Sequence, residues 1–390
     1  MAGLDTTHPA ISDLRRAAKR RLPHFVFEYL DSATGDHEAG VKVNRQGYDA
    51  LQFLPSVLHG HAKPDLRTTL LGFEFARPFG MAPVGMSGLI WPDAERLLAA
   101  EAQHLRIPYC LSTVATQVPE RVGPVAGDMG WFQLYPPAKR EVARDMLKRA
   151  KDSGFQAAIM TVDVPADSRR ERQRRANLTI PPKITPAMVW SMLTHPRWSL
   201  GTLRTGRPSL KLAEDYAQGS GTADYMNHPG KAIRGYPDWD DLKAVREDWD
   251  GPLIVKGVLR PEDAARLKEE GVDAVWVSNH SARQFEGGPS ALSTLAPIRA
   301  VVGPDYPLIF DSGIEGGLDI IRALNQGADF VFLGRAWHFA LAGLGPEGVR
   351  HLNHILTEDL ITNLAMLGAH NLLDVRSLTP FKKDLVPSRV

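Results

Sequence analysis

The chain has 390 residues, with 46 lysines and arginines against 45 aspartates and glutamates, 43% hydrophobic residues and one cysteine. This length suits two ordinary domains or one large α/β domain with insertions. The balanced charge argues against nucleic-acid binding, which normally needs a basic surplus to neutralise phosphates. A single cysteine, Cys110, excludes an internal disulfide framework and fits a reducing compartment.

No segment has the pattern of an export signal or of a membrane-spanning helix. The N-terminus has basic residues without an apolar stretch behind them. The longest apolar run, 79–91, contains Pro83 and is shorter than the roughly 18 residues that a spanning helix needs. We therefore expect an intracellular protein, soluble or peripheral to a membrane.

The first 78 residues precede a repeating pattern and do not share it. Two stretches, 12–21 and 23–31, have helical character. We expect residues 1–78 to form an N-terminal helical cap on a single domain that spans residues 1–390.

From residue 79 to about residue 380, short apolar runs alternate with amphipathic stretches. The runs are continuously apolar, as is typical of parallel strands covered on both faces. Eight runs occur, at 79–84, 108–112, 130–135, 156–162, 252–257, 273–278, 307–312 and 329–334. This order predicts a (β/α)8 TIM barrel over residues 79–380. The alternative, a doubly wound open sheet, predicts a GxGxxG turn after the first strand, and that turn is absent.

The connection between the fourth and fifth strands, residues 163–251, is far longer than an ordinary βα loop. It holds an arginine run at 169–175, which we interpret as a solvated loop or, alternatively, as a contact for an anionic substrate or a membrane surface. A helix-like segment rich in Met and Trp follows at 185–200. We expect this insertion to be a lid, a binding loop or a disordered segment.

Polar groups stand at the end of nearly every predicted strand, where TIM barrels place their active sites. Any one of them has a simpler interpretation as a strand cap, but the whole set favours an active site. The set is Gly85, Ser112, Gln133, Tyr135, Thr161, Asp163, Lys256, Ser278, His280, Asp311, Ser312, Gly313, Gly334 and Arg335.

Two glycine-rich loops, 311–317 and 333–336, follow the seventh and eighth strands. Barrels often bind phosphate at this place through backbone N–H groups and a helix N-terminus. Tight turns that need glycine for their backbone conformation are an equal alternative. The loops suggest a phosphate-bearing ligand or cofactor without naming it.

His280 and Arg283 share one strand end and face Asp163. A histidine can accept a proton, and a carboxylate can orient its ring and stabilise its cation. An arginine can hold a substrate carboxylate through two hydrogen bonds. This combination favours a catalytic role for His280 over a structural role in the core.

No metal site is expected. The 13 histidines form no HExxH motif, and His351 and His354 share a helical face without carboxylates at ligand spacing. We expect both on the helix surface.

The segment SNHSARQFEGGPS (278–290) resembles the SNHGGRQLDGAPA signature of the FMN-dependent α-hydroxy-acid dehydrogenases and oxidases. The likeness runs nearly end to end, through 21–36, 131–135, 161–165, 254–257 and 333–336. Within that family, the segments 194–210 and 169–172 look most like the mandelate dehydrogenases and the bacterial lactate dehydrogenases.

This resemblance implies FMN as cofactor and oxidation of an (S)-2-hydroxy acid, lactate- or mandelate-like, to the 2-oxo acid. His280 would be the base, and Asp163 would stabilise its protonated form. The substrate carboxylate would be bound by Tyr29, Arg170 and Arg283, and its α-hydroxyl by Tyr135. Lys256 would lie near flavin N1 and O2. The remaining cofactor contacts would be Pro83, Val84, Gly85, Ser112, Gln133, Thr161, Ser278, Asp311, Ser312, Gly313, Gly334 and Arg335.

Several positions depart from the family pattern. Glu315 occupies the phosphate loop where the family usually has Arg, so we expect it to point away or to be offset by Arg335 or Lys256. Ser281 and Ala282 replace a common Gly-Gly. Val114 stands where glycolate oxidase has Trp, which favours a substrate larger than glycolate.

Gly85 bears on the electron acceptor. The oxidases of the family commonly have Ala there, so Gly favours a dehydrogenase that passes electrons to a quinone or another carrier. An oxidase that uses O2, a flavoenzyme for a specialised peptide or metabolite, and a non-catalytic barrel remain as alternatives.

The resemblance also implies partners. In the mandelate and lactate relatives the long insertion mediates membrane association. Here five side chains offer an interfacial apolar face: Met188, Trp190, Met192, Leu193 and Trp198. An active-site lid or a subunit contact is the alternative. The resemblance further implies a homotetramer that is cytoplasmic or peripheral on the inner face of the cell membrane.

Overall fold

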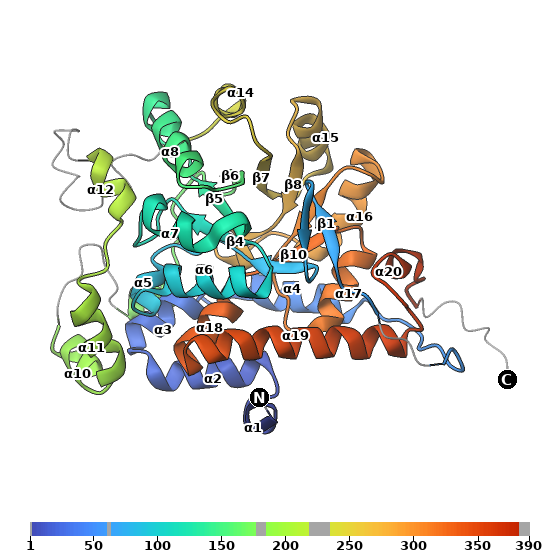
Figure 1. Cartoon of the computed structure of the whole chain (residues 1–390), viewed down its shortest axis with the longest axis horizontal. Helices are drawn as coiled ribbons and strands as arrows, with labels where there is room; N and C mark the ends of the chain where they lie inside the picture. The colour runs from blue at the N-terminus through green and yellow to red at the C-terminus, as the bar shows by residue number, and fades with distance from the viewer. Residues whose placement is uncertain (1, 61–63, 177–184, 218–234, 382–390) are drawn as a thin grey trace.

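A computed structural model describes residues 2–60, 64–176, 185–217 and 235–381 (Figure 1). Eight parallel strands close into a barrel in the order β10-β3-β4-β5-β6-β7-β8-β9. They are β3 (Phe79–Met81), β4 (Tyr109–Ser112), β5 (Gly130–Leu134), β6 (Ala157–Thr161), β7 (Leu253–Val258), β8 (Ala274–Val277), β9 (Leu308–Phe310) and β10 (Phe330–Leu333). The predicted (β/α)8 barrel is confirmed, and the open sheet is excluded because the last strand pairs with the first.

A short hairpin that the sequence did not predict precedes the barrel. Its strands, β1 (Thr68–Leu70) and β2 (Phe73–Phe75), pair antiparallel. The ring of Phe75 lies 6.0 Å from that of Trp131 and 5.3 Å from that of Phe330. Both partners stand near the beginning of a barrel strand, so the hairpin closes the amino-terminal end of the barrel.

Helices cover the outside of the barrel. They are α5 (Ser87–Ile90), α6 (Ala94–Leu105), α7 (Pro119–Ala126), α8 (Arg140–Asp152), α14 (Trp239–Asp248), α15 (Pro261–Glu269), α16 (Ala291–Val302), α17 (Gly317–Asn325), α18 (Arg335–Leu344), α19 (Pro346–Met366) and α20 (Asp374–Ser377). Of these, α6, α7, α8, α15, α16 and α17 pack directly against the strands, which leaves the strands buried on both sides and explains their continuously apolar sequence.

Four helices form the N-terminal segment: α1 (Ala2–Thr7), α2 (Ile11–Arg21), α3 (His24–Asp31) and α4 (Ala39–Asp49). Helix α2 lies against α18 (Figure 1), and a Cβ on Gly343 would come within 3.1 Å of the Ala17 Cβ. This close approach places α3 at the carboxyl ends of the strands, where the Tyr29 hydroxyl donates to the Gly85 carbonyl at 2.9 Å.

The insertion after β6 contributes α9 (Glu171–Arg175), α10 (Pro186–Leu193), α11 (Pro196–Thr205) and α12 (Lys211–Ala217). In Figure 1, α10, α11 and α12 lie at one side of the barrel. The segment 185–200 is two helices instead of one helix-like unit, because Pro196 has no N–H and disfavours the helical conformation at His195.

The apolar face expected on this insertion is only partly correct. Trp190 and Leu193 are exposed, but Met188 and Trp198 are buried and Met192 is partly buried. The indole of Trp198 donates to the Leu89 carbonyl at 2.9 Å and fixes α11 to α5. Of the described helices, none combines the length and the apolarity that crossing a membrane would require.

The expectation that both His351 and His354 lie on the helix surface is wrong for His351. They share one face of α19, with their rings 6.0 Å apart, but His351 is fully buried. Its Nε2 lies 2.9 Å from the His8 carbonyl oxygen, and the Nε2 of His354 lies 3.1 Å from Oδ2 of Asp5. The N-terminal residues cover this face of α19, and the sequence of α19 alone does not reveal that contact.

Candidate active site

The register of the barrel brings polar side chains together at its carboxyl end. Ser112 pairs with Gln133 across β4 and β5, and Thr161 pairs with Lys256 across β6 and β7. All four side chains are buried, and the Ser112 hydroxyl donates to Oε1 of Gln133 at 2.8 Å. The strand ends therefore form one polar surface above an apolar barrel interior.

Lys256 is a buried cation at the centre of this surface. Its Nζ donates to the Ser278 hydroxyl at 2.7 Å and lies 2.8 Å from Oδ2 of Asp311. Ser278 in turn donates to Oδ1 of Asp311 at 2.5 Å. A buried charge requires such partners, and they hold the ammonium group of Lys256 in one place.

Beside this group, Nδ1 of His280 faces the carboxylate of Asp163. Burial alone would raise the pKa of Asp163, but the charge and hydrogen bond of His280, with the charge of Lys256, hold that pKa below its ordinary value. Asp163 is therefore an anion at neutral pH. A carboxylate here can orient the imidazole and stabilise its protonated form.

His280 begins a strained turn. In the short 3-10 turn η3 (His280–Ala282), the φ angles of His280, Ser281 and Ala282 are +55°, +53° and +60°. Residues with a side chain disfavour this left-handed conformation by roughly 1–2 kcal/mol each. Hydrogen bonds from several backbone N–H groups hold the turn; among them, that of Ser281 donates to the Ser312 hydroxyl at 3.1 Å, and that of Ala282 donates to Oδ1 of Asn279 at 3.2 Å.

Two arginines meet the carboxyl end of α3. Arg283 donates to the carbonyls of Tyr29, Leu30 and Ser32 at 2.8–3.0 Å, and Arg335 donates to the carbonyl of Asp31 at 3.1 Å. This end of a helix carries partial negative charge. Among the described residues, neither guanidinium forms an ion pair with a carboxylate.

These arginines are held in surroundings that favour an added anion. Burial, together with the charge of Arg170, lowers the pKa of Arg283 to about 9, and burial also lowers the pKa of Arg335. A cation without a carboxylate partner gains most from an anionic ligand, such as a carboxylate or a phosphate.

Two phenols face the same region. Burial raises the pKa of Tyr29 and that of Tyr135, while the charges of Arg283 and Arg170 act in the opposite direction on both. Both phenols are therefore neutral hydrogen-bond donors at neutral pH. The influence of Arg170 on both tyrosines also indicates that this arginine lies near them.

Comparison with known proteins agrees with this geometry. A family model described as FMN-dependent dehydrogenase matches residues 18–379. The chain belongs to this family. It is 34% identical over 368 residues to an L-lactate dehydrogenase of Acinetobacter baumannii, covering 94% of this chain and 96% of the relative. An L-lactate dehydrogenase of Xanthobacter autotrophicus is 35% identical over 366 residues, covering 93% of this chain and 94% of the relative.

Solved structures of mandelate enzymes are also similar. The crystal structure of the monotopic membrane protein (S)-mandelate dehydrogenase superposes with a TM-score of 0.88 at 33% identity, covering 95% of this chain and 97% of that one. A structure of mandelate oxidase has a TM-score of 0.79 at 28% identity, covering 96% of this chain and 99% of that one. The protein is thus an enzyme of the FMN-dependent 2-hydroxy-acid dehydrogenase and oxidase family, with FMN as its cofactor.

The residues present fit FMN. Nε2 of Gln133 and Oγ1 of Thr161 are buried at the carboxyl ends of β5 and β6, and neither has a hydrogen-bond partner in the described part of the chain. Buried polar atoms are rarely left unpaired, and the flavin ring offers both donors and acceptors. Arg335, which lacks a carboxylate partner, fits the phosphate.

Glu315 lies on the solvent-exposed side of its loop. Its side chain is exposed, and its ion pair, at 3.7 Å, is with Arg45. This exposure fits the first of the two expected alternatives, that Glu315 points away; of the partners named in the second, Lys256 pairs with Asp311 instead. Arg335 likewise forms no ion pair with Glu315 in the described part of the chain. Arg45 also binds Asp319 in two hydrogen bonds of 2.7 and 2.9 Å, so an arginine from α4 occupies the neighbourhood of this loop.

Sequence reasoning missed two parts of the site. The arginine run 169–175 is not simply a solvated loop, because Arg172 binds carboxylates of the N-terminal segment. His338 was also missed: it is buried, and its two ring nitrogens contact the Ser87 hydroxyl and the Gly334 carbonyl. A charge run and a histidine inside a helix give no signal of such contacts.

Proposed function

We propose that the enzyme oxidises an (S)-2-hydroxy acid of the lactate or mandelate type to the 2-oxo acid. The observation that carries this proposal is the His280–Asp163 pair beside Arg283, a partly buried arginine with no carboxylate partner among the described residues. A proton acceptor next to a carboxylate-binding cation is what this reaction requires.

In this proposal His280 accepts a proton from the substrate through Nε2, because its Nδ1 is directed at Asp163. Asp163 stabilises the cation that results. Arg283, Arg170 and Tyr29 bind the substrate carboxylate, and Tyr135 donates to the α-hydroxyl oxygen. The flavin, when bound, supplies the two-electron acceptor.

The proposed cofactor contacts follow the polar surface. Lys256 lies where its fixed charge can favour a reduced, anionic ring. Arg335 and the loops 311–317 and 333–336 bind the phosphate and the ribityl chain. The ring and the ribityl chain are lined by Pro83, Val84, Gly85, Ser112, Gln133, Thr161 and Ser278.

The small side chain of Val114 favours a substrate larger than glycolate. A Cβ on Gly85 would lie 2.8 Å from Cγ2 of Val114 and 3.6 Å from the Tyr29 hydroxyl. Val114 therefore borders the same space as Tyr29, and its small side chain leaves room for a methyl or phenyl substituent. We propose a quinone or another carrier as the electron acceptor, which Gly85 favours; use of O2, as in the similar mandelate oxidase, is the alternative.

We also propose that α10 and α11 contact the inner face of the cell membrane and that the protein is a homotetramer. Trp190, Leu193, Leu200 and Leu203 are 69%, 70%, 54% and 79% exposed. An exposed apolar face beside arginines is typical of interfacial helices, and a similar mandelate dehydrogenase is described as a monotopic membrane protein. The tetramer rests on the family resemblance.

The visible spectrum of the purified protein tests the reaction. We expect a flavin band that bleaches when (S)-mandelate or (S)-lactate is added without oxygen, and that returns slowly with O2 and rapidly with a quinone. Rapid return with O2 would make the enzyme an oxidase. A flavin band that neither acid bleaches would contradict the proposed substrates and favour a specialised one.

A further inference from the structure

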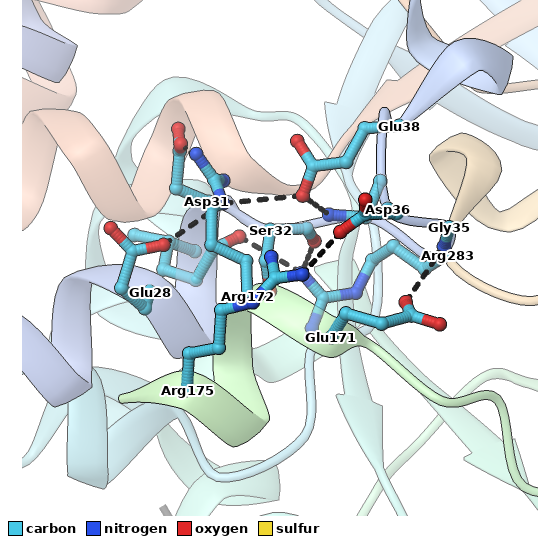
Figure 2. A network of polar contacts seen from close by, with 12 residues as sticks. Glu28, Asp31, Ser32, Gly35, Asp36, Glu38, Glu171, Arg172, Arg175 and Arg283 are labelled. Carbon is cyan, nitrogen blue, oxygen red and sulfur yellow. Dashed lines mark hydrogen bonds and ion pairs between the residues drawn. The ribbon is translucent and has the colours of Figure 1, made fainter. Parts of the chain in front are cut away.

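Arg172 lies at the centre of an ion-pair network between the insertion and the N-terminal segment (Figure 2). Its Nε lies 2.9 Å from Oε2 of Glu28 and 3.2 Å from Oε1 of Glu38. Its Nη2 donates to Oδ2 of Asp31 at 2.7 Å. One guanidinium thus contacts three carboxylates from two places in the chain.

The carboxylates are already fixed by other bonds. Asp31 accepts from Nη2 of Arg15 at 2.7 Å, and Glu38 accepts from the N–H of Ala33 at 2.8 Å. The side chains of Asp31 and Glu28 are 6% and 9% exposed, against 34% for Arg172. Arg172 therefore binds a rigid acidic cluster, and its loss would remove the one guanidinium that contacts all three carboxylates among the described residues.

Two further contacts tie the same short helix to the same segment. Oε2 of Glu171 accepts from the N–H of Gly35 at 2.9 Å, and Arg175 forms an ion pair with Asp36. Figure 2 shows these α9 side chains directed at residues 28–38. The Arg175–Asp36 pair is largely exposed, so it is expected to hold the helix less firmly than Arg172 does.

This attachment bears on Arg170, which stands immediately before α9. Its backbone is left-handed, with φ +44°. In the described part of the chain its side chain forms no ion pair, and its Nε donates to the Ser168 hydroxyl at 3.0 Å. The position of Arg170 therefore depends on how α9 is held. Helix α3, which Arg172 contacts, also contains Tyr29 and carbonyls that accept from Arg283.

We propose that Arg172 is a positioning residue, which holds α9 against α3 so that Arg170, Tyr29 and Arg283 stay together around the substrate carboxylate. This inference rests on the proposed function. Arg172 itself does not touch the substrate. The substrate carboxylate remains bound throughout the reaction. Loss of the Arg172 contacts therefore weakens carboxylate binding equally in the ground state and in the transition state.

The test uses the full-length, flavin-loaded enzyme and three variants. Arg172→Gln removes the charge, Arg172→Lys keeps it, and Arg175→Gln is the matched control on the same helix. The measurements are KM and kcat for the acid that the parent oxidises, flavin content, and amide hydrogen exchange of peptides within 165–176.

We expect Arg172→Gln to raise KM about tenfold with kcat changed less than about threefold, and to speed exchange in 165–176 with flavin content unchanged. Arg172→Lys should restore KM and the exchange rate most of the way to the parent values. For Arg175→Gln, KM should stay within about twofold of that of the parent. If Arg172→Gln does not fold, Glu38→Gln, which leaves Arg172 in place, should give the same pattern in weaker form.

An Arg172→Gln variant with the KM and the exchange of the Arg175→Gln control would overturn the proposal. So would an equal fall in kcat and flavin content with KM unchanged, because that pattern indicates general destabilisation. A parent that oxidises no 2-hydroxy acid would contradict the proposed function, and the exchange data would then decide by themselves whether Arg172 holds the loop.

Discussion

Nδ1 of His280 lies 3.1 Å from Oδ2 and 3.2 Å from Oδ1 of Asp163, so the imidazole faces both carboxylate oxygens. Asp163 reaches this position because Gly257 has no side chain: a Cβ there, at φ +105°, would come within 2.5 Å of the Asp163 Cβ. The histidine is fixed from the other side by its left-handed turn. The pair is thus held by the backbone of two neighbouring strand ends.

Replacing His280 with Ala is expected to leave FMN bound but to slow flavin reduction by substrate roughly 10²–10⁴-fold, because the proton acceptor is lost. Anaerobic stopped-flow absorbance measures the rate. His354→Ala, which removes a partly exposed imidazole on α19, is the control and should reduce at the parent rate. If His280→Ala also reduced at the parent rate, the base assignment would be wrong.

Asp163→Asn keeps the shape of the side chain and removes its charge, so the protonated imidazole loses its stabilising partner. We expect flavin reduction to slow by about 10–100-fold. Because both residues act through one proton transfer, the double variant should be no slower than His280→Ala alone. Additive losses would mean that Asp163 acts independently of His280.

The barrel could be predicted because its strands are buried on both faces. The run at 252–257 is continuously apolar until Lys256, and the structure places the strand at Leu253–Val258. Residues that interrupt such a run mark the end of the strand, which is where the polar groups of the site gather. Fold and location of the site therefore follow from the same pattern.

Contacts between distant parts of the chain could not be predicted. The partners of Arg172 lie about 140 residues away, and nothing in an arginine run identifies them. The strands β1 and β2 have three residues each, too few for a periodic pattern. The residues of this chain do not reveal the left-handed turn at Ser281, because neither Ser281 nor its neighbours is glycine; the Gly-Gly that the family commonly has at Ser281 and Ala282 was the available signal.

The strain at that turn gives a stability prediction. Ser281→Gly should relieve about 1–2 kcal/mol of left-handed strain against about 0.4–1 kcal/mol of added unfolded-state entropy, so we expect a net gain of about 1 kcal/mol. The control, Ser293→Gly in α16, should lose a similar amount. Urea unfolding with unchanged m-values measures both. A destabilised Ser281→Gly would show that the turn is not strained.

Membrane contact by α10 and α11 is tested with anionic phospholipid vesicles. Replacing both Trp190 and Leu193 with Ser should reduce co-sedimentation at least about tenfold, because each side chain loses the free energy of burial in the interface. Leu373→Ser removes an equally exposed apolar side chain elsewhere, with 72% exposure, and should bind like the parent. Equal binding by all three proteins would contradict the proposed contact.

His338 predicts how stability depends on pH. It is 3% exposed, its Nε2 lies 2.8 Å from the Ser87 hydroxyl, and its Nδ1 lies 3.0 Å from the Gly334 carbonyl oxygen. Burial lowers the pKa of His338 to about 4, although the bond to Gly334 acts in the opposite direction. The imidazole is therefore neutral in the folded protein near pH 7 and links the start of α5 to the start of its own helix, α18, beside the candidate cofactor site.

The sign of the effect follows from the two protonation equilibria. As the pH is lowered below the unfolded pKa of about 6.5, the unfolded chain binds the proton before the folded protein does. The free energy of unfolding therefore decreases as the pH decreases, until the folded pKa near 4 is reached. The loss over this window is about 3 kcal/mol.

His338→Gln should be less stable than the parent at pH 7 but should lose about 3 kcal/mol less than the parent between pH 6.5 and 4. Urea unfolding at several pH values measures the difference, and His104→Gln, which removes an exposed imidazole, should keep the parent's dependence. If His338→Gln lost as much stability as the parent over this window, His338 would not be the group that titrates.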